Sequence, residues 1–295
     1  MSLTRNLLVA ATLLAPALSP AIAGEISTST QLLTDDYLGD GHDRWRSASY
    51  ATSRLNGNSD SDVREFRLRF EMITPNRLKL ATSEDADRPA AGLIGFGFYR
   101  SGVHAGLDYR LGAGLAATGP SVMVLDFQDT LHQALGMDEL SKPLLDGQIG
   151  DKVRPTLSGE IGHQLGRGQV EIRPWLAAET GFETMARGGV DLVVGAEAFG
   201  FGVRDEVTGW RLPVNEKDRE TRGLSFIAGA DIAHVFDSVL LDGREIERDR
   251  TRLRAGLQYH FNDSSVFMGW TRLSEEFKGQ LEPQTTASIS VNIGF

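Results

Sequence analysis

The chain has 295 residues, no cysteine and a formal net charge of -10, and its mean hydropathy is -0.20. So acidic a chain is unsuited to nucleic acid, because binding phosphates requires clustered lysine and arginine. The lack of cysteine suits an exported protein that does not depend on disulfides. Near-neutral hydropathy does not exclude a membrane β-barrel, since only every second residue of a barrel strand faces lipid.

Residues 1 to 23 have the pattern of a cleaved signal peptide. Arg5 precedes an apolar run over residues 7 to 18, and Ala21-Ile22-Ala23 supplies the small residues that signal peptidase requires. That run is shorter than the ~20 residues of a spanning helix. A buried N-terminal helix is the alternative, but the segment lacks the polar face of a surface helix. We therefore expect a mature domain of residues 24 to 295.

The mature chain contains about twelve segments whose length suits the tilted strands of a membrane barrel. Residues 288 to 295 show the clearest period-two alternation, with Ile, Val, Ile and Phe on one face and Ser, Ser, Asn and Gly on the other. Residues 103 to 111 and 252 to 261 alternate similarly and carry arginine and histidine on the polar face. The pattern predicts an all-β protein: a twelve-stranded antiparallel transmembrane β-barrel of the outer membrane.

A water-soluble β-sandwich would show the same alternation, but two features favour a barrel. The chain ends on Phe295, which resembles the C-terminal assembly signal of outer-membrane barrels, and short and long connections alternate. Tight turns are expected at 101–102, 167–168 and 262–263, and longer joins at 34–44, 74–90, 118–153 and 238–249. A periplasmic N-terminus places the first three long joins outside the cell. The polar join at 203–223 does not fit, because the same count places it in the periplasm.

Two polar clusters lie in outward joins, whereas common hydrolase and metal motifs such as G-x-S-x-G and H-E-x-x-H are absent from the sequence. The first cluster is TDDYLGDGHDRWRS, residues 34 to 47, with four carboxylates among other oxygen donors. Such a loop could hold a hard cation such as Ca²⁺, which takes about six to eight oxygen ligands. A solvated acidic loop is the alternative.

The second cluster begins with TGPS at residues 118 to 121. Residues 126 to 135 are expected to form a short helix in this extracellular loop, ended by Gly136. Gln128 and His132 are four residues apart and therefore share a face of the helix. A histidine can act as a general base near neutral pH, although a packed or solvated loop histidine is the commoner case. The role of His42, in the other outward join, stays open.

Together, the TDDYLGDGHDRWRS stretch, the TGPS segment followed by Gln128 and His132, and the strand count resemble the outer-membrane lipid A 3'-O-deacylases of the LpxR type. The resemblance covers essentially the whole mature chain. It implies a barrel that needs Ca²⁺, has its active site at the outward end and removes the 3'-linked acyloxyacyl chain of lipid A. The expected partner is lipopolysaccharide in the outer membrane of a Gram-negative cell. A monomer is expected, although the oligomeric state stays open.

The resemblance assigns the catalytic histidine to His132 and its neighbouring glutamine to Gln128. The family's Asn-Asp-Asp run corresponds to Thr34-Asp35-Asp36, which keeps both carboxylates and replaces the amide with a hydroxyl. The family's active-site threonine, which follows an Asp-Arg pair, corresponds to Ser47 after Asp43-Arg44.

Two further positions depart from the family. Some members use a lysine after the third strand, whereas the corresponding residues 84 to 89 carry only Arg88 as a cation. Asp138 replaces a family glutamate and is a candidate ligand. The implied sites can be stated together: the catalytic residues are His132, Ser47, Gln128, Thr34 and Asp35, and the Ca²⁺ ligands are Asp35, Asp36 and Asp138.

The hypothesis is that His132 deprotonates a water that attacks the ester, Ca²⁺ polarises the carbonyl, and Ser47 and Gln128 position the reacting groups. Attack by Ser47 itself would require a base within hydrogen-bond reach. The main alternative is a catalytically inactive barrel with a structural or lipopolysaccharide-binding role, because Thr34 and the missing lysine depart from the family. A diffusion pore is a weaker alternative, since charged side chains would fill so narrow a lumen.

Overall fold

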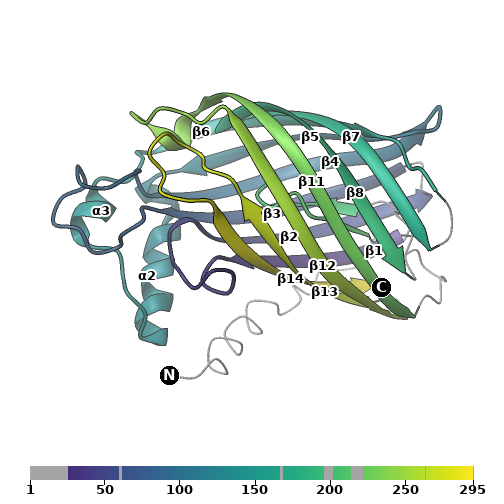
Figure 1. The fold of residues 1–295 in the computed structure, drawn as a ribbon, viewed down its shortest axis with the longest axis horizontal. Coiled ribbons are helices and arrows are strands. Elements are labelled where there is room, and N and C mark those ends of the chain that lie inside the picture. Colours follow the sequence, from purple (N-terminus) through teal and green to yellow (C-terminus); the bar gives the residue numbers. More distant parts are fainter. Residues whose placement is uncertain are drawn as a thin grey trace.

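The structure is a computed structural model that describes residues 26–59, 62–166, 169–195, 202–213, 222–262 and 264–294. In these residues twelve strands form a closed antiparallel barrel, in which β1 pairs with β14 (Figure 1). The wall strands are β1 (Ile26–Asp35), β2 (Trp45–Ser59), β3 (Asp62–Thr74), β4 (Ala91–His104), β5 (Leu107–Thr118), β6 (Lys152–Gly162), β7 (Val170–Thr180), β8 (Glu183–Gly195), β11 (Gly223–Ser238), β12 (Asp249–Phe261), β13 (Ser264–Leu273) and β14 (Gln284–Gly294). The predicted twelve-stranded antiparallel barrel is confirmed.

Both ends of the chain carry sequence predictions that the structure does not describe. The expected signal peptide, residues 1 to 23, and the terminal Phe295 lie outside the described residues. Among the helices of the described residues, none has the length and apolar character needed to cross a membrane.

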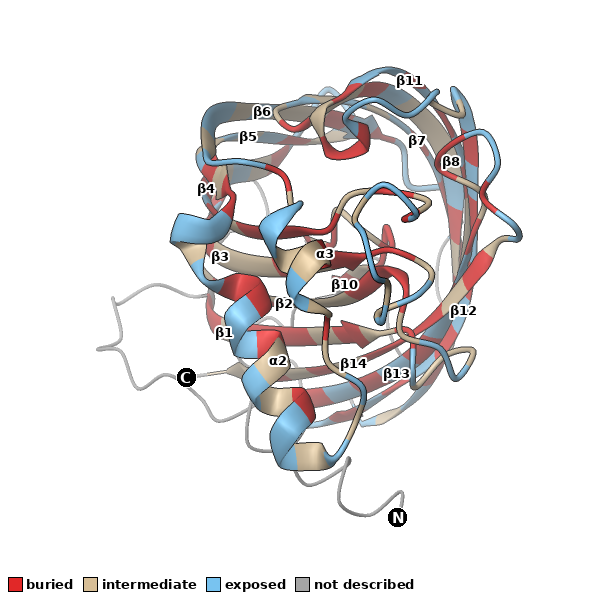
Figure 2. Ribbon diagram, turned by 90° about the vertical axis from the view of Figure 1, so that its left-hand side faces the viewer, coloured by how far each residue is buried: buried red, intermediate tan, exposed pale blue. Residues whose placement is uncertain are grey.

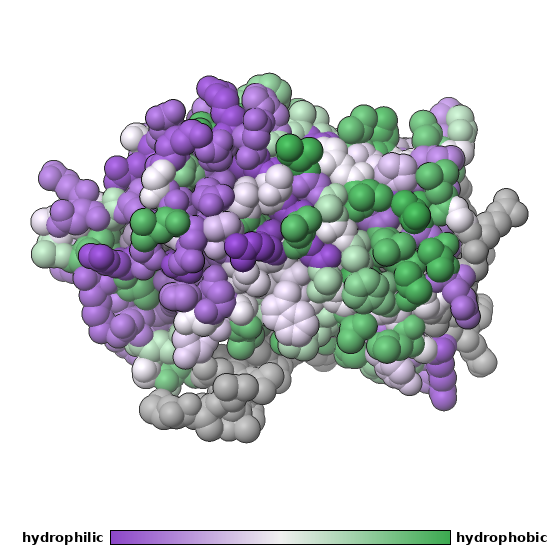
Figure 3. Space-filling view, in the orientation of Figure 1, coloured by the Kyte–Doolittle hydropathy of each residue, from purple (hydrophilic) through white to green (hydrophobic). Residues whose placement is uncertain are grey.

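Alternation along the strands separates the two faces of the wall. On β12, Leu253, Leu257 and Tyr259 are about half exposed, whereas Arg252 and Arg254 are buried in the lumen. Lipid chains accommodate the apolar side chains but not the guanidinium groups, so the arginines must face inward. Figure 3 shows apolar side chains gathered over one half of the barrel and polar side chains over the other half, toward the end that carries the helices.

Ion pairs line the lumen. Asp231 contacts three arginines: Arg187 Nη1 lies 2.5 Å and Arg252 Nε 3.0 Å from Asp231 Oδ1, and Arg254 Nη1 pairs with Oδ2. Arg254 also lies 2.6 Å from Asp191. Buried charges of this kind are tolerated only where each has compensating partners.

The alternating run at 103–111, expected as one strand, is two strands joined by a turn, so that prediction and the turn at 101–102 are wrong. Ala105 and Gly106 have φ of 51° and 80° and form the turn between β4 and β5. Positive φ at both central residues gives a turn whose twist matches a hairpin. Periodicity alone could not place it, because the alternation continues through it. The turn expected at 262–263 falls between the paired strands β12 and β13, and Asn262 has a φ of 57°. Residue 263 and the turn expected at 167–168 lie outside the described residues.

The polar join at 203–223 that did not fit the strand count contains a hairpin inside the barrel. Its strands are β9 (Gly202–Arg204) and β10 (Arg211–Pro213), which pair with each other and not with the wall. Trp210 and Leu212 are fully buried. They form one apolar cluster with Leu32, Val193, Ile227 and Phe267 of the wall.

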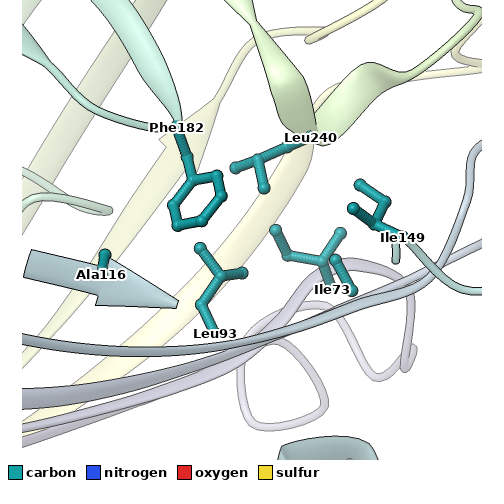
Figure 4. Packing of buried hydrophobic residues seen from close by; sticks show 7 residues of the cluster. Ile73, Leu93, Ala116, Ile149, Phe182 and Leu240 are labelled. Carbon is teal, nitrogen blue, oxygen red and sulfur yellow. The ribbon is translucent and has the colours of Figure 1, made fainter. Parts of the chain in front are cut away.

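Long joins cover the end of the barrel that we call the outward end, which Figure 2 views directly. The join after β5 contains η1 (Pro120–Val122), α2 (Val124–Leu135) and α3 (Lys142–Asp146), and η2 (Val239–Leu241) follows β11. The predicted helix is confirmed as α2, which ends at Gly136 with φ of 69°. Inside this mouth the joins contribute to an apolar cluster in which Phe182 and Leu240 face Leu93 and Ile73 (Figure 4).

The helix α2 docks on the outer face of the wall at Gly92 of β4. Gly92 shares a strand face with Phe96 and Phe98, which are 45% and 63% exposed. A Cβ atom added at Gly92 would lie 2.7 Å from Val124 Cβ, at the start of α2. Only glycine allows the helix to approach the strand this closely.

We predict that Gly92→Ala displaces α2 without opening the barrel. The added methyl overpacks the contact and should cost about 1–3 kcal/mol of docking free energy. Limited proteolysis should therefore cut within α2 faster than in the parent protein, while heat-modifiable gel mobility stays that of a folded barrel. Gly159→Ala is the matched control, because its Cβ would meet its nearest neighbour at 3.6 Å. Equal cleavage of the two variants would show that the close approach at Gly92 does not hold the helix.

We also predict that Asp231→Asn destabilises the barrel, because it leaves three lumen arginines without their shared carboxylate. Breaking a buried ion pair by removing one partner costs about 3–5 kcal/mol. Urea unfolding in detergent or lipid measures this free energy. Asp242→Asn is the control, because the Asp242 side chain is 73% exposed and its ion pair with Lys152 is long, at 4.0 Å. A loss no larger than that of the control would contradict this role of Asp231.

Candidate functional site

A cluster of polar side chains lies between α2 and the outer face of β2 and β3, at the outward end. Gln128 and His132 lie on the buried face of α2 and are 2% and 6% exposed. Ser47 of β2 and Thr74 of β3 are 1% and 0% exposed. Figure 2 shows α2 on the side of the barrel where β1, β2 and β3 are labelled. The cluster is therefore built on the outside of the wall, beneath the helix.

Asp43 is the centre of this cluster. Its Oδ2 lies 3.0 Å from His132 Nε2. Its Oδ1 accepts hydrogen bonds from the Ser47 hydroxyl and, at 3.4 Å, from Gln128 Nε2. Burial raises the pKa of Asp43, and the adjacent His132 and the Ser47 hydrogen bond partly oppose that shift. One carboxylate thus connects the imidazole, the hydroxyl and the amide.

The orientation of His132 is fixed by its other ring nitrogen. Nδ1 lies 2.5 Å from the backbone carbonyl oxygen of Asp138, which can only accept a hydrogen bond. Nδ1 therefore carries a proton, and Nε2 is the nitrogen that faces the Asp43 carboxylate at 3.0 Å. The turn that follows α2 places this carbonyl, because Met137 N donates to His132 O at 2.9 Å.

Ser47 reaches the cluster because β2 has a bulge there. The register with β3 shifts between Arg46 and Ala48. Arg46 points into the lumen, where it pairs with Glu71, Glu183 and Glu276. An extra residue in one strand re-aims a side chain that regular alternation would fix. The Ser47 hydroxyl accordingly meets Asp43 and, at 3.3 Å, Thr74 Oγ1.

The loop between β1 and β2 positions Asp43. Asp36 Oδ2 accepts hydrogen bonds from Arg44 N at 2.8 Å and from Gln284 Nε2 at 3.0 Å. Asp35 Oδ1 accepts one from Leu38 N at 2.9 Å. A Cβ atom at Gly39 would lie 2.2 Å from the Thr285 carbonyl oxygen, so the loop packs against β14 only with glycine at this position.

The structure brings part of the predicted site together. His132, Gln128 and Ser47 all contact Asp43. Asp35 lies close enough to Asp43 and His132 to interact with both electrostatically.

Other predicted residues lie elsewhere. Thr34 Oγ1 is 2.8 Å from Ser288 Oγ on the lumen side of the wall. The Asp36 carboxylate accepts hydrogen bonds from Arg44 N and Gln284 Nε2 within the loop between β1 and β2. The Asp138 carboxylate pairs with Lys79, with both side chains largely exposed. His42 is exposed beside Asp40. The side chains of Thr34, Asp36 and Asp138 are therefore not gathered around His132.

Sequence reasoning missed Asp43 and Lys79. Asp43 was noticed only as half of the Asp-Arg pair before Ser47, although a carboxylate four residues from a hydroxyl was a usable signal. The resemblance pointed to residues 84 to 89 for the cation after the third strand. Arg88, the cation in that stretch, is buried against Glu276. Lys79 lies earlier in the same join and pairs with the residue whose carbonyl holds His132.

The fit of a Ca²⁺ ion depends on which oxygen donors converge. Within the described residues, no group of three or more Asp, Glu, His or Cys side chains is arranged to hold a metal, so Asp35, Asp36 and Asp138 do not form one set. The donors that do lie near one another are the carboxylates of Asp35 and Asp43 and the Ser47 hydroxyl. These are hard oxygen donors of the kind that Ca²⁺ prefers, so the chemistry of the site fits the ion at Asp35 and Asp43.

Comparisons with known proteins bear on the family and the fold. The family model described as outer membrane protein LpxR matches residues 33–295. The solved structure of LpxR from Salmonella typhimurium is 16% identical, with a TM-score of 0.75 over 91% of this chain and 100% of that chain. The translocator domain of the autotransporter NalP from Neisseria meningitidis is 8% identical, with a TM-score of 0.49 over 99% of this chain and 94% of that chain. No match was found among curated proteins.

The structural match and the match to the family model support different conclusions. At this low identity the structural likeness to Salmonella LpxR shows the shared barrel fold, and the match to the family model over most of the chain shows membership. The chain therefore belongs to the LpxR family, the outer-membrane lipid A deacylases, and its place is the outer membrane of the cell.

Proposed function

We propose that this protein is an active, Ca²⁺-dependent lipid A deacylase that hydrolyses the ester of the 3'-linked acyloxyacyl chain. The observation that carries the proposal is the contact of Asp43 with His132, Ser47 and Gln128 on the outer face of the wall. Lipopolysaccharide occupies the outer leaflet at this level of the barrel. Its ester bonds therefore lie on the same side of the wall as the cluster.

His132 acts as the general base. The water oxygen bonds to the ester carbonyl carbon while the water proton passes to His132 Nε2. In the free protein Asp43 Oδ2 lies 3.0 Å from Nε2, so the water must replace this contact before Nε2 can accept its proton. The Asp43 carboxylate beside the ring then stabilises the imidazolium that forms. The bond between the carbonyl carbon and the sugar oxygen then breaks, and the proton on Nε2 passes to that oxygen. The hydrogen bond from Nδ1 to the Asp138 carbonyl holds the ring in place throughout.

Ser47 and Gln128 orient the reacting groups. The hydroxyl and the side-chain amide both donate to Asp43 in the free protein. In the complex they are placed to hold the attacking water and the oxygen on which negative charge develops. When bound at Asp35 and Asp43, Ca²⁺ would supply a Lewis acid for the ester carbonyl.

The alternative is an inactive barrel that binds lipopolysaccharide or has a structural role. Thr34, which faces the lumen side, does not argue for this alternative, because its side chain lies away from His132. Lys79 also weakens it, since the join after β3 does supply a lysine near the cluster. A diffusion pore is disfavoured because ion pairs and the β9–β10 hairpin occupy the lumen.

The first experiment is mass spectrometry of lipid A incubated with the detergent-folded protein, with Ca²⁺ or with chelator. We expect loss of the 3'-linked acyl group only when Ca²⁺ is present. His132→Ala should lower the rate by about 10²–10⁴-fold, because it removes the general base.

Gln133→Ala is the matched control for that variant, since Gln133 is the next residue of α2 and is exposed. It should retain the parent rate. Unchanged lipid A under both conditions, from a barrel shown to be folded, would favour the inactive alternative. Full activity of His132→Ala would instead refute the assignment of the base.

A separate variant tests Asp43. Asp43→Asn keeps the size of the side chain but removes the charge that stabilises the imidazolium, so kcat should fall by about a hundredfold or more. At saturating Ca²⁺, KM for lipid A should change little, whereas more Ca²⁺ should be needed for half-maximal activity, because Asp43 is also a proposed ligand of the ion. Asp126→Asn, on the exposed side of α2, should leave both constants unchanged. A selective rise in KM would mean that Asp43 contributes to binding and not to the proton transfer.

A further inference from the structure

We propose that the β9–β10 hairpin is an internal plug that makes the barrel impermeable. It enters the lumen from the connection between β8 and β11, and it leaves the barrel wall complete without it. The proposal is independent of the deacylase site, which lies on the other side of the wall.

Apolar contacts hold the hairpin on one side. The Trp210 ring meets the Phe267 ring edge-on at a centroid distance of 4.7 Å. Trp210 and Leu212 pack with residues of β1, β8, β11 and β13, and Val203 packs with Leu55 of β2 and Val63 of β3. Apolar side chains inside an otherwise charged lumen are stable only when they are covered in this way.

Ion pairs hold the hairpin on its other sides. The hairpin contributes a carboxylate to some of these pairs and a guanidinium to others. Glu206 of the hairpin tip pairs with Arg67 at 2.8 Å and accepts a hydrogen bond from Tyr99 at 2.9 Å. Arg211 of the hairpin lies 3.3 Å from Asp108 and 3.2 Å from Glu160. Charges of each sign on the hairpin therefore meet the opposite sign on the wall.

The backbone of the hairpin tip is bonded to the wall as well. Arg252 Nη1 donates to the carbonyl oxygens of Glu206 at 2.9 Å and Val207 at 3.0 Å. The tip is shaped by its own sequence, because Asp205 Oδ2 accepts hydrogen bonds from Thr208 N at 2.7 Å and from Thr208 Oγ1 at 2.6 Å. Gly209 has φ of 75°, and a Cβ atom there would lie 2.6 Å from Arg252 Nη2. The hairpin tip therefore fits against Arg252 of the wall only with glycine at position 209.

Free space at the outward end of the barrel reaches the hairpin tip. A cavity of about 130 Å³ has Gly181, Phe182 and Ser274 of the outward end in its lining, together with Glu206 and Val207 of the tip. The wall contacts of the hairpin close the lumen below it, so the plug separates the cavity from the opposite end of the barrel.

The test is ion conductance in planar lipid bilayers. The parent protein should give no steady current. Replacing residues 203–213 with a Gly-Ser segment of equal length keeps the connection but removes every side chain that contacts the wall. This variant should raise the current by about tenfold or more, because a twelve-stranded barrel without a plug retains a lumen. A folded variant that conducts no more than the parent would overturn the proposal, as would a steady current through the parent.

A second measurement covers the case in which the variant fails to fold. The chain has no cysteine, so Thr208→Cys introduces a single thiol at a position that is 0% exposed. If the hairpin is seated, a membrane-impermeant maleimide should label this thiol at least about tenfold more slowly than the thiol of Asp242→Cys at the exposed outward end. Equal labelling rates would show that the hairpin is not held in the lumen.

Discussion

The closed hydrogen-bonded wall is the constraint on which the rest of this structure depends. A membrane offers no partners to backbone N–H and C=O groups, so the strands must satisfy one another around a complete ring. Closure fixes which side chain of every pair faces lipid and which faces the lumen. Arginines and carboxylates on the inner face, such as Arg254 and Asp231, then have to neutralise each other in a narrow space. A lumen filled in this way leaves little room for a substrate.

The candidate site arises where the wall departs from regularity. The bulge at Ser47 re-aims one hydroxyl, Gly92 lets α2 approach the outer face, and the loop from β1 to β2 brings Asp43 beneath the helix. Each departure acts on the outward end, and together they gather polar groups beside the lipid. The inner face contributes stability and, through the β9–β10 hairpin, closure. Catalysis and permeability are thus assigned to opposite sides of one wall.

Period-two alternation was sufficient to predict the fold, because a residue's face in a barrel follows from its position in the strand. Alternation could not locate the turn at Ala105 and Gly106, since the pattern runs through it. It also could not show that the join containing Trp210 folds into the lumen, because that depends on contacts with strands distant in sequence. The helix pair Gln128 and His132 was predictable from local spacing. Their link to Asp43, and the lumen-side position of Thr34, required the three-dimensional arrangement.

The central claim is that lipid A is bound and hydrolysed on the outer face of the wall, beneath α2. The most direct test is an experimental structure of the protein with Ca²⁺ and a lipid A analogue whose 3'-ester is replaced by an ether, which binds without being cleaved. The account predicts that the analogue lies between α2 and the ends of β1 to β3, with the ether oxygen beside His132. An analogue bound inside the lumen, or on the wall away from α2, would contradict it.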